Sequence, residues 1–132
     1  MTAKQLETKE EMERALPMIV DAMDVLGGTH ELPDLIQLIM NGDLTLWISK
    51  KSFMLTEVVE YPRLKELNMF LVGGNLEELL EYDDPVTEYA IGQGCARIEG
   101  HARPGFGRNR TMRAIGFVPR QTVVSKEIRC HG

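Results

Sequence analysis

The pattern of apolar and polar positions predicts two helices at the start of the chain. Residues 8–11, TKEE, match a capping box, and apolar side chains then recur at helical spacing until Gly27-Gly28. Pro17 lies inside this pattern and lacks a backbone donor, so either the helix kinks there or a second helix starts there. A short and mostly apolar helix is predicted over residues 32–40, with Gly42 as its C-terminal cap.

The hydrophobic period changes to two after residue 43, which predicts strands. Apolar and polar residues alternate over 44–48, a turn follows at 50–52, and residues 53–60 form the second strand of a hairpin. Residues 64–72 are a third strand that ends at Gly73-Gly74. The middle of the chain is therefore an antiparallel meander.

The second half of the chain alternates between helices and strands. The predicted elements, in order, are a helix over 76–81 capped by Asn75, a helix beginning at Asp84-Pro85 and running toward Gly92, a strand over 96–101, a helix over 106–115, and a strand over 122–128. A strand separated from its predecessor by a helix is expected to be its parallel neighbour. The fold class is therefore α/β, with a mixed sheet flanked by about four helices.

The length and composition predict a single globular domain. With 132 residues and 43% hydrophobic content, residues 1–132 are expected to form a single compact domain. The first residues lack the pattern of a secretory signal and no apolar run is long enough to span a membrane, so we expect a cytoplasmic protein. Cys95 and Cys130 are expected to be free thiols, and no spacing typical of a metal site is present.

The charge is unevenly distributed along the chain. The net charge is −5, but residues 1–95 carry 7 Lys+Arg against 18 Asp+Glu, whereas residues 96–132 carry 8 against 2. A general nucleic-acid binder is usually basic overall, so nucleic acid is not the expected partner. The preferred interpretation is that the two parts attract each other within the fold or across a homo-oligomer.

The order of elements, with "EYAIGQGCARIEGHA" followed by "MRAIGFVPRQTVVSKEI", resembles the GNAT (Gcn5-related N-acetyltransferase) family. Two further stretches, "VVEYPRLKELNMFLVGGNLEELLE" and "RIEGHARPGF", are similar to small phage and prophage GNAT-like proteins, some of which are encoded among virion genes. The resemblance implies a GNAT fold, with phage structural proteins as possible partners and the host cytoplasm or the virion as the location.

The resemblance also implies a position for acetyl-CoA. In the family, the strand matching residues 68–72 separates from the one matching 96–101, and pantetheine lies in the gap. A glycine-containing turn then presents backbone N–H groups to the pyrophosphate. The positions that match are Leu71, Val72, Gly73, Gly74 and Asn75.

This sequence departs from the family pattern in two places. The turn has no leading Gln or Arg and is followed by Glu77 and Glu78, whose charges repel a pyrophosphate. Met112 stands where the family often has a tyrosine that acts as a general acid, and a thioether cannot donate a proton. Gly73-Gly74 then has the simpler role of a turn, and Asn75 that of a helix cap.

The candidates for removing a proton from an amine are Glu57 and His101. Glu57 shares a strand face with Phe53 and Leu55, and His101 ends the strand beside the expected cleft. The simpler interpretations are a solvent-facing glutamate and a half-exposed surface histidine. His30 and His131 are weaker candidates, since one lies in a loop and the other at the terminus.

Four arginines, Arg103, Arg108, Arg110 and Arg113, mark a basic surface around the predicted helix 106–115. The binding partners considered for this surface are a CoA phosphate, nucleic acid and an acidic protein surface, of which the last fits the charge distribution best. The sequence thus supports two functions. One is an accessory or virion-associated GNAT-fold protein with a degenerate acetyl-CoA loop and weak or no activity. The other is an active acetyl-CoA-dependent N-acyltransferase.

Overall fold

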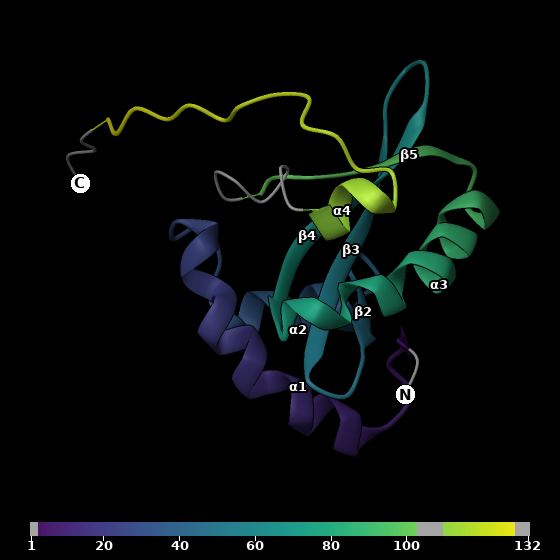
Figure 1. Ribbon diagram of the computed structural model, residues 1–132. Coiled ribbons are helices and arrows are strands. Elements are labelled where there is room, and N and C mark those ends of the chain that lie inside the picture. The colour runs from purple at the N-terminus through teal and green to yellow at the C-terminus, as the bar shows by residue number, and fades with distance from the viewer. Residues whose placement is uncertain (1–2, 103–109, 129–132) are drawn as a thin grey trace. The chain divides into compact units, whose positions relative to one another are not determined.

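The computed structural model describes residues 3–102 and 110–128. The chain divides into two compact units, Met1–Gly100 and His101–Gly132. The expectation of one domain over 1–132 stays a prediction. The elements are shown in Figure 1. The first unit contains, in order, β1 (Lys4–Gln5), α1 (Lys9–Ala22), the 3-10 helix η1 (Met23–Leu26), α2 (Leu32–Met40), β2 (Thr45–Ile48), β3 (Ser52–Glu60), β4 (Lys65–Gly74), the 3-10 helix η2 (Leu76–Glu78), α3 (Leu79–Gly92) and β5 (Cys95–Gly100). The second unit contains α4 (Arg110–Ala114).

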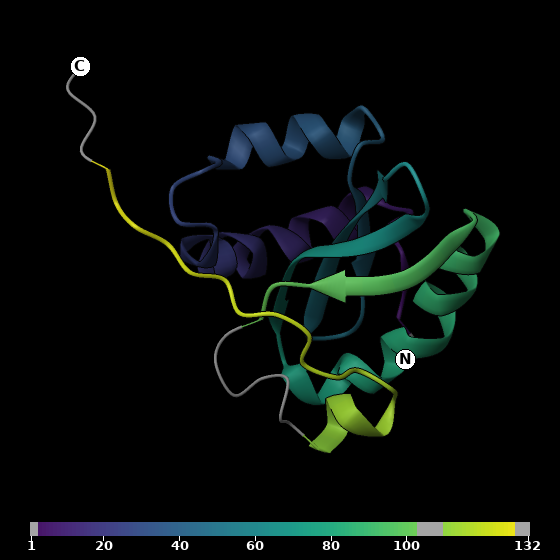
Figure 2. The ribbon, with the colours of Figure 1, turned by 90° about the horizontal axis from the view of Figure 1, so that it is seen from above.

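The first unit is built around a single mixed sheet. Its strands lie in the order β1-β2-β3-β4-β5, and every neighbouring pair is antiparallel except β4 and β5, which are parallel. Helices α1 and α2 cover one face of the sheet and α3 covers the other (Figure 2). The predicted α/β class, with an antiparallel meander and a parallel pair across a helix, is confirmed.

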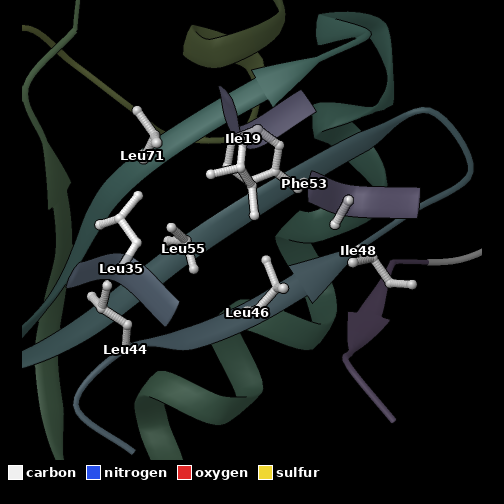
Figure 3. Packing of buried hydrophobic residues seen from close by; sticks show 9 residues of the cluster. Ile19, Leu35, Leu44, Leu46, Ile48, Phe53, Leu55 and Leu71 are labelled. Atoms are coloured by element: carbon white, nitrogen blue, oxygen red, sulfur yellow. The ribbon is translucent and has the colours of Figure 1, made fainter. Parts of the chain in front are cut away.

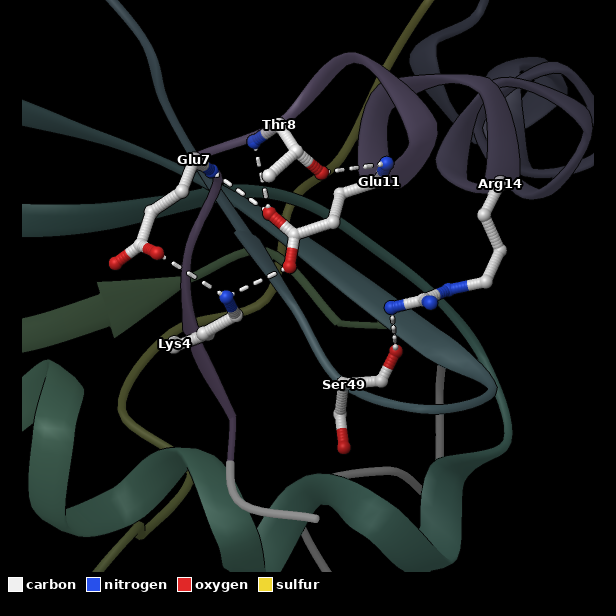
Figure 4. A network of polar contacts seen from close by, with 6 residues as sticks. All are labelled: Lys4, Glu7, Thr8, Glu11, Arg14 and Ser49. Carbon is white, nitrogen blue, oxygen red and sulfur yellow. Dashed lines mark hydrogen bonds and ion pairs between the residues drawn. The ribbon is translucent and has the colours of Figure 1, made fainter.

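The predicted beginning of the first helix is confirmed in detail. The Thr8 hydroxyl accepts the Glu11 N–H at 3.1 Å, while the Glu11 carboxylate accepts the N–H groups of Glu7 and Thr8 and lies 2.7 Å from Lys4 Nζ (Figure 4). These contacts hold the pKa of Glu11 down at about 2, with the Lys4 bond as the largest cause. The helix continues through Pro17, so no second α-helix starts there.

The core lies between α1, α2 and the sheet face below them. Figure 3 shows how side chains from β2, β3 and β4 meet those of the two helices. The buried cluster consists of Ala15, Ile19, Leu35, Leu44, Leu46, Ile48, Phe53, Leu55 and Leu71. The alternation that predicted the strands placed the cluster residues from 44 to 71 on one face, because successive strand side chains point to opposite sides.

One helix replaces the two that were predicted after β4. The Asp84-Pro85 pair was expected to begin a new helix, but α3 runs from Leu79 to Gly92 with Pro85 inside it. Buried residues on both sides of the proline, Tyr82 and Val86 among them, pack on one side of the helix. Continuous burial of this face outweighs the single backbone hydrogen bond that proline removes.

Two further expectations about strands were wrong. Residues 122–128 form no strand, and Val123, Val124 and Ile128 are 64–88% exposed. A β-prone sequence forms a strand only where a neighbouring strand pairs with it. Conversely, the two-residue β1 was missed because it is too short to show an alternating pattern.

The last predicted helix is described only from residue 110. The structure contains α4 over Arg110–Ala114, and the start expected at 106 lies outside the described residues. Gly116 has φ +98° and its N–H binds the Arg113 carbonyl, so the predicted end of this helix is confirmed.

Candidate functional site

Strands β4 and β5 stop pairing at a defined point. The parallel register runs from Lys65 opposite Cys95 to Met69 opposite Gly100. Residues 70–74 continue along β3 but have no β5 partner in the described part of the chain. The unpaired edge therefore begins at residue 70. Asn68 and Met69, which belong to the predicted gap between 68–72 and 96–101, are paired with Glu99 and Gly100.

A β-bulge coincides with this point. Leu55 lies opposite Leu71 and Thr56 lies opposite Met69, so Phe70 is the extra residue in β4. A bulge of this kind bends its strand and changes the direction of its side chains. The bend explains locally why β4 follows β3 but leaves β5.

The ring of His30 lies against the bulge. His30 and Phe70 make an edge-to-face contact with ring centroids 5.1 Å apart. The Thr29 hydroxyl donates to the Leu26 carbonyl at 3.1 Å and lies 2.7 Å from His30 Nδ1. Because the bond to Leu26 uses the single hydrogen of that hydroxyl, we expect the hydroxyl to accept from Nδ1–H, with the ring's lone pair on Nε2. The sequence ranked His30 as a weak candidate because it lies in a loop, and the contact with Phe70 could not be seen from the sequence.

The predicted cofactor-binding residues all have structural roles. Leu71 is in the core and Val72 is half-buried. A Cβ on Gly73 would lie 2.7 Å from the Phe53 ring, and one on Gly74, where φ is +89°, would meet the Lys51 carbonyl. The Lys51 carbonyl accepts the N–H of Asn75, whose side chain accepts the Glu77 N–H at 2.9 Å and so caps η2.

Two carboxylates at the start of α3 contact the turn between β2 and β3. Glu78 Oε1 accepts the Lys51 N–H at 3.0 Å and the Ser52 hydroxyl at 2.7 Å, and Glu81 accepts the Ser49 hydroxyl at 3.4 Å. Burial raises the pKa of Glu78, but these donors outweigh burial and lower it overall. The start of α3 therefore holds the β2–β3 turn through carboxylates.

Glu57, the first candidate base, lies in a polar row across three strands. It is opposite Asn68 on β4, and Asn68 is opposite Glu99 on β5. The Asn68 side-chain amide donates to Glu57 Oε1 at 2.8 Å and orients the carboxylate. The alternation along β3 pointed to Glu57, but the partner in the sequence-distant strand could not be seen from it.

An ion pair between a buried carboxylate and an exposed arginine lies beside this row. Glu66 is only 4% exposed and its Oε2 lies 2.7 Å from Arg97 Nε, while its Oε1 accepts the Tyr61 hydroxyl at 3.3 Å. The negative charge of Glu66 raises the pKa of Tyr61. Arg97 also lies 3.5 Å from Glu99, so the carboxylates here are linked by one guanidinium.

Most of the remaining candidates belong to the second unit. His101 is exposed and belongs to the second unit, as do Arg110 and Arg113, which are exposed on α4. Arg103 and Arg108 lie outside the described residues. Cys95 is a half-buried free thiol whose pKa is raised by burial.

Over residues 3–102 and 110–128, no three side chains of His, Cys, Asp or Glu are grouped to hold a metal ion. None of the helices in those ranges is long and apolar enough to cross a membrane.

Comparison with known proteins identifies the fold. No family model matches the sequence, and no curated protein is similar to it. The structure is similar to that of the aminoglycoside N-acetyltransferase AAC(6')-Iy in complex with CoA, with a TM-score of 0.71 and 13% identity over 97% of this chain and 99% of that one. The chain has the GNAT fold.

Two other GNAT-fold structures cover the chain as completely. A probable acetyltransferase has a TM-score of 0.69 and 12% identity over 100% of this chain and 99% of its own. A ribosomal-protein-alanine N-acetyltransferase from Brucella melitensis biovar Abortus has a TM-score of 0.65 and 12% identity over 98% and 100%. The expected GNAT architecture is thus confirmed at the level of the fold.

Proposed function

We propose that this GNAT-fold protein has a degenerate acetyl-CoA loop, has weak or no acetyltransferase activity, and serves as an accessory or virion-associated protein of phage or prophage type. The observation that carries the degenerate loop is the set of carboxylates at the start of α3. A pyrophosphate placed there would meet Glu77, Glu78 and Glu81 where the family offers N–H groups.

The phage context of this proposal rests on the sequence resemblance alone. It implies phage structural proteins or a second copy of the chain as partners, in the host cytoplasm or the virion. The exposed Arg110 and Arg113 of α4 suit an acidic protein surface. If nucleic acid were the partner instead, replacing both by alanine would reduce salt-dependent retention on a DNA column, and we expect no such change.

Comparing acetyl-CoA with S-acetylpantetheine tests the degenerate loop. The two ligands share the thioester arm, but only acetyl-CoA carries the diphosphate. By titration calorimetry we expect acetyl-CoA to bind no more than about threefold tighter, because the loop adds no favourable contact to the diphosphate. Acetyl-CoA binding about 100-fold tighter, with release of CoA when primary amines are added, would refute the proposal.

A pair of variants tests whether a carboxylate next to the turn weakens the binding of acetyl-CoA. Glu77→Gln removes an exposed charge next to the turn and should raise the affinity for acetyl-CoA about twofold to threefold without changing that for S-acetylpantetheine. Glu88→Gln changes the charge equally in the last turns of α3 and is the matched control. An equal response of both variants would mean that only net charge matters.

An active acetyl-CoA-dependent N-acyltransferase is the second candidate function, and the unpaired edge of residues 70–74 favours it. An extended pantetheine arm has amides that can pair with such an edge, as an added strand would. Glu57 or a water molecule would then take the proton from the amine, with the exposed His101 as the lesser candidate. Measurable acetyl transfer that Glu57→Gln lowers at least tenfold in kcat would favour this function over the first.

A further inference from the structure

We propose that Asn41, at the end of α2, is a site of spontaneous deamidation whose rate is set by the last turn of the helix. The chain contains four asparagines, and only Asn41 is followed by glycine. The others precede Met69, Leu76 and Arg110. Asn41 and Gly42 are both exposed, and no atom of a more distant residue lies within 4 Å of the position that a Gly42 Cβ would occupy. Solvent therefore reaches the reacting groups, and no side chain crowds them.

The reaction uses the backbone nitrogen of Gly42 as its nucleophile. This nitrogen, deprotonated by hydroxide, attacks Cγ of Asn41 and closes a five-membered succinimide ring. The Cγ–NH2 bond breaks, and the amide leaves as ammonia with a proton from water. A water molecule then opens the ring at either carbonyl and gives aspartate or isoaspartate. Glycine favours this reaction, because it has no Cβ beside the attacking nitrogen.

The folded end of α2 holds the nucleophile away from Cγ. Asn41 has φ −77° and ψ −11°, and the Gly42 N–H donates to the Ile39 carbonyl at 3.1 Å. Ring closure requires rotation about ψ of Asn41 and the loss of this hydrogen bond. The last turn of a helix opens more readily than its middle, since its end groups are exposed to water. Deamidation in the folded chain therefore proceeds through transient opening of this turn.

A side-chain contact restrains the electrophile as well. Gln37 Nε2 donates to Asn41 Oδ1 at 2.9 Å. Because Gln37 lies one turn earlier in α2, this bond directs the Asn41 amide toward the N-terminal side of its own Cα, whereas the nitrogen of Gly42 lies on the C-terminal side. The bond must break before Cγ can reach that nitrogen. Gln37 therefore protects Asn41 from the reaction.

Deamidation changes the connection between α2 and β2. The N–H groups of Asp43 and Leu44 both bind the Leu38 carbonyl, at 2.9 and 3.1 Å, and Leu44 belongs to the core. Isoaspartate adds one carbon atom to the main chain just before this connection, so these bonds cannot keep their geometry. Both products also add a negative charge at the C-terminal end of a helix, where the helix dipole disfavours it. The reaction therefore loosens the start of a core strand.

The inference goes beyond the proposed function, because the reaction needs neither an acyl donor nor a partner. Timed incubation of the full-length chain at slightly alkaline pH tests it, since peptide mass spectrometry detects each deamidation as a gain of one mass unit. We expect Asn41 to react at least about tenfold faster than Asn75, which is also exposed but is followed by Leu76. Equal rates at the two asparagines would overturn the inference.

The same measurement in concentrated urea tests the control by the helix end. Unfolding removes the two hydrogen bonds that restrain Asn41 and Gly42, so Asn41 should react about tenfold faster in urea than in the folded chain. A rate at Asn41 that urea leaves unchanged would show that the last turn of α2 does not set it.

A pair of variants tests the restraint by Gln37. Gln37→Met removes the side-chain amide and keeps a similar helix propensity. It should speed deamidation of Asn41 about twofold to threefold and leave the rate at Asn75 unchanged. Gln5→Met, the same change at an exposed position of β1, is the matched control and should leave both rates as in the wild type.

A rate at Asn41 that does not rise in Gln37→Met, or that rises equally in Gln5→Met, contradicts the restraint. Circular dichroism shows whether each variant is folded. If Gln37→Met does not fold, the comparison in urea decides, because it uses the wild type alone.

The effect of the product on stability is measured separately. Asn41→Asp carries the new charge on a normal main chain and should lower Tm by about 1–5 °C. The isoaspartyl protein, isolated from aged wild type by chromatography, should melt a further 5–10 °C lower, as a rough estimate, because the bonds to the Leu38 carbonyl are lost. Equal Tm values for these two proteins would contradict the loosening of the α2–β2 connection.

Discussion

The sheet face under α1 and α2 has two halves that differ in kind although they use the same strands. In one half, Phe53, Leu55 and Leu71 are buried under the helices. In the other half, the positions that follow along β3 and β4 carry Glu57 and Asn68. The bulge at Phe70 lies at the boundary between the two halves.

This difference separates the residues that stabilise the fold from those that offer chemistry. The apolar half excludes water, so its side chains contribute through burial. The polar half is held by pairs between neighbouring strands, Asn68 with Glu57 and Arg97 with Glu66, which fix the positions of the carboxylates. The candidate chemistry therefore lies in the half of the sheet face that is held by polar pairs.

The largest effect is expected in the apolar half. Leu55 is fully buried, so Leu55→Ala should lower the free energy of unfolding by about 2–5 kcal/mol, measured by urea denaturation. Asn68→Ala, in the polar half, should cost only about 0.5–1.5 kcal/mol, because one hydrogen bond is lost beside solvent. Equal costs for the two variants would remove the distinction between the halves.

Within the polar half, the Glu66–Arg97 pair should show the next largest effect. Arg97→Ala leaves a carboxylate that is 4% exposed without its guanidinium and should cost about 1–3 kcal/mol. Adding Glu66→Gln should recover part of this loss, since the unpaired charge is then gone. Arg63→Ala, an exposed arginine in the β3–β4 turn, is the control and should change stability by less than about 0.5 kcal/mol.

Local signals predicted the elements whose ends are set locally. The helix over residues 32–40 agrees to the residue, because Pro33 in its first turn and Gly42 after its end both act within one turn. The strands around the core followed from alternation. The same kind of local signal gave a wrong prediction at Asp84-Pro85, because burial along α3 keeps one helix continuous through Pro85.

What the sequence could not provide were contacts between distant residues. The strand expected over 122–128 depends on a neighbour that no local pattern can supply. Likewise, Asn68 beside Glu57 and His30 beside Phe70 arise only when the sheet and the loop after η1 are assembled. The sequence therefore indicated which strands carry the candidate residues, but it did not indicate which side chains meet there.

Glu11 sharpens the comparison, because it is a carboxylate with a purely structural role. Its folded pKa of about 2 lies below the ordinary 4.5, so its contribution to stability is present above pH 4.5 and is lost as the pH falls toward 2. Glu11→Gln should lower Tm at pH 7, and its Tm should approach that of the wild type near pH 2. Glu10→Gln, exposed in the same first turn, should follow the wild type at every pH, and a parallel fall of all three curves would contradict this role.

The smallest effect concerns the boundary itself, where His30 meets Phe70. The Thr29 hydroxyl uses its single hydrogen for the Leu26 carbonyl, so we expect ¹⁵N NMR of the neutral ring to show the hydrogen on Nδ1 and the lone pair on Nε2. Thr29→Val removes this acceptor and should shift the ring toward the other tautomer with little change in Tm. The exposed His101 should keep the same tautomer ratio in both proteins. A hydrogen on Nε2 in the wild type would contradict the assignment, because the ring would then carry an N–H donor at that atom in place of a lone pair.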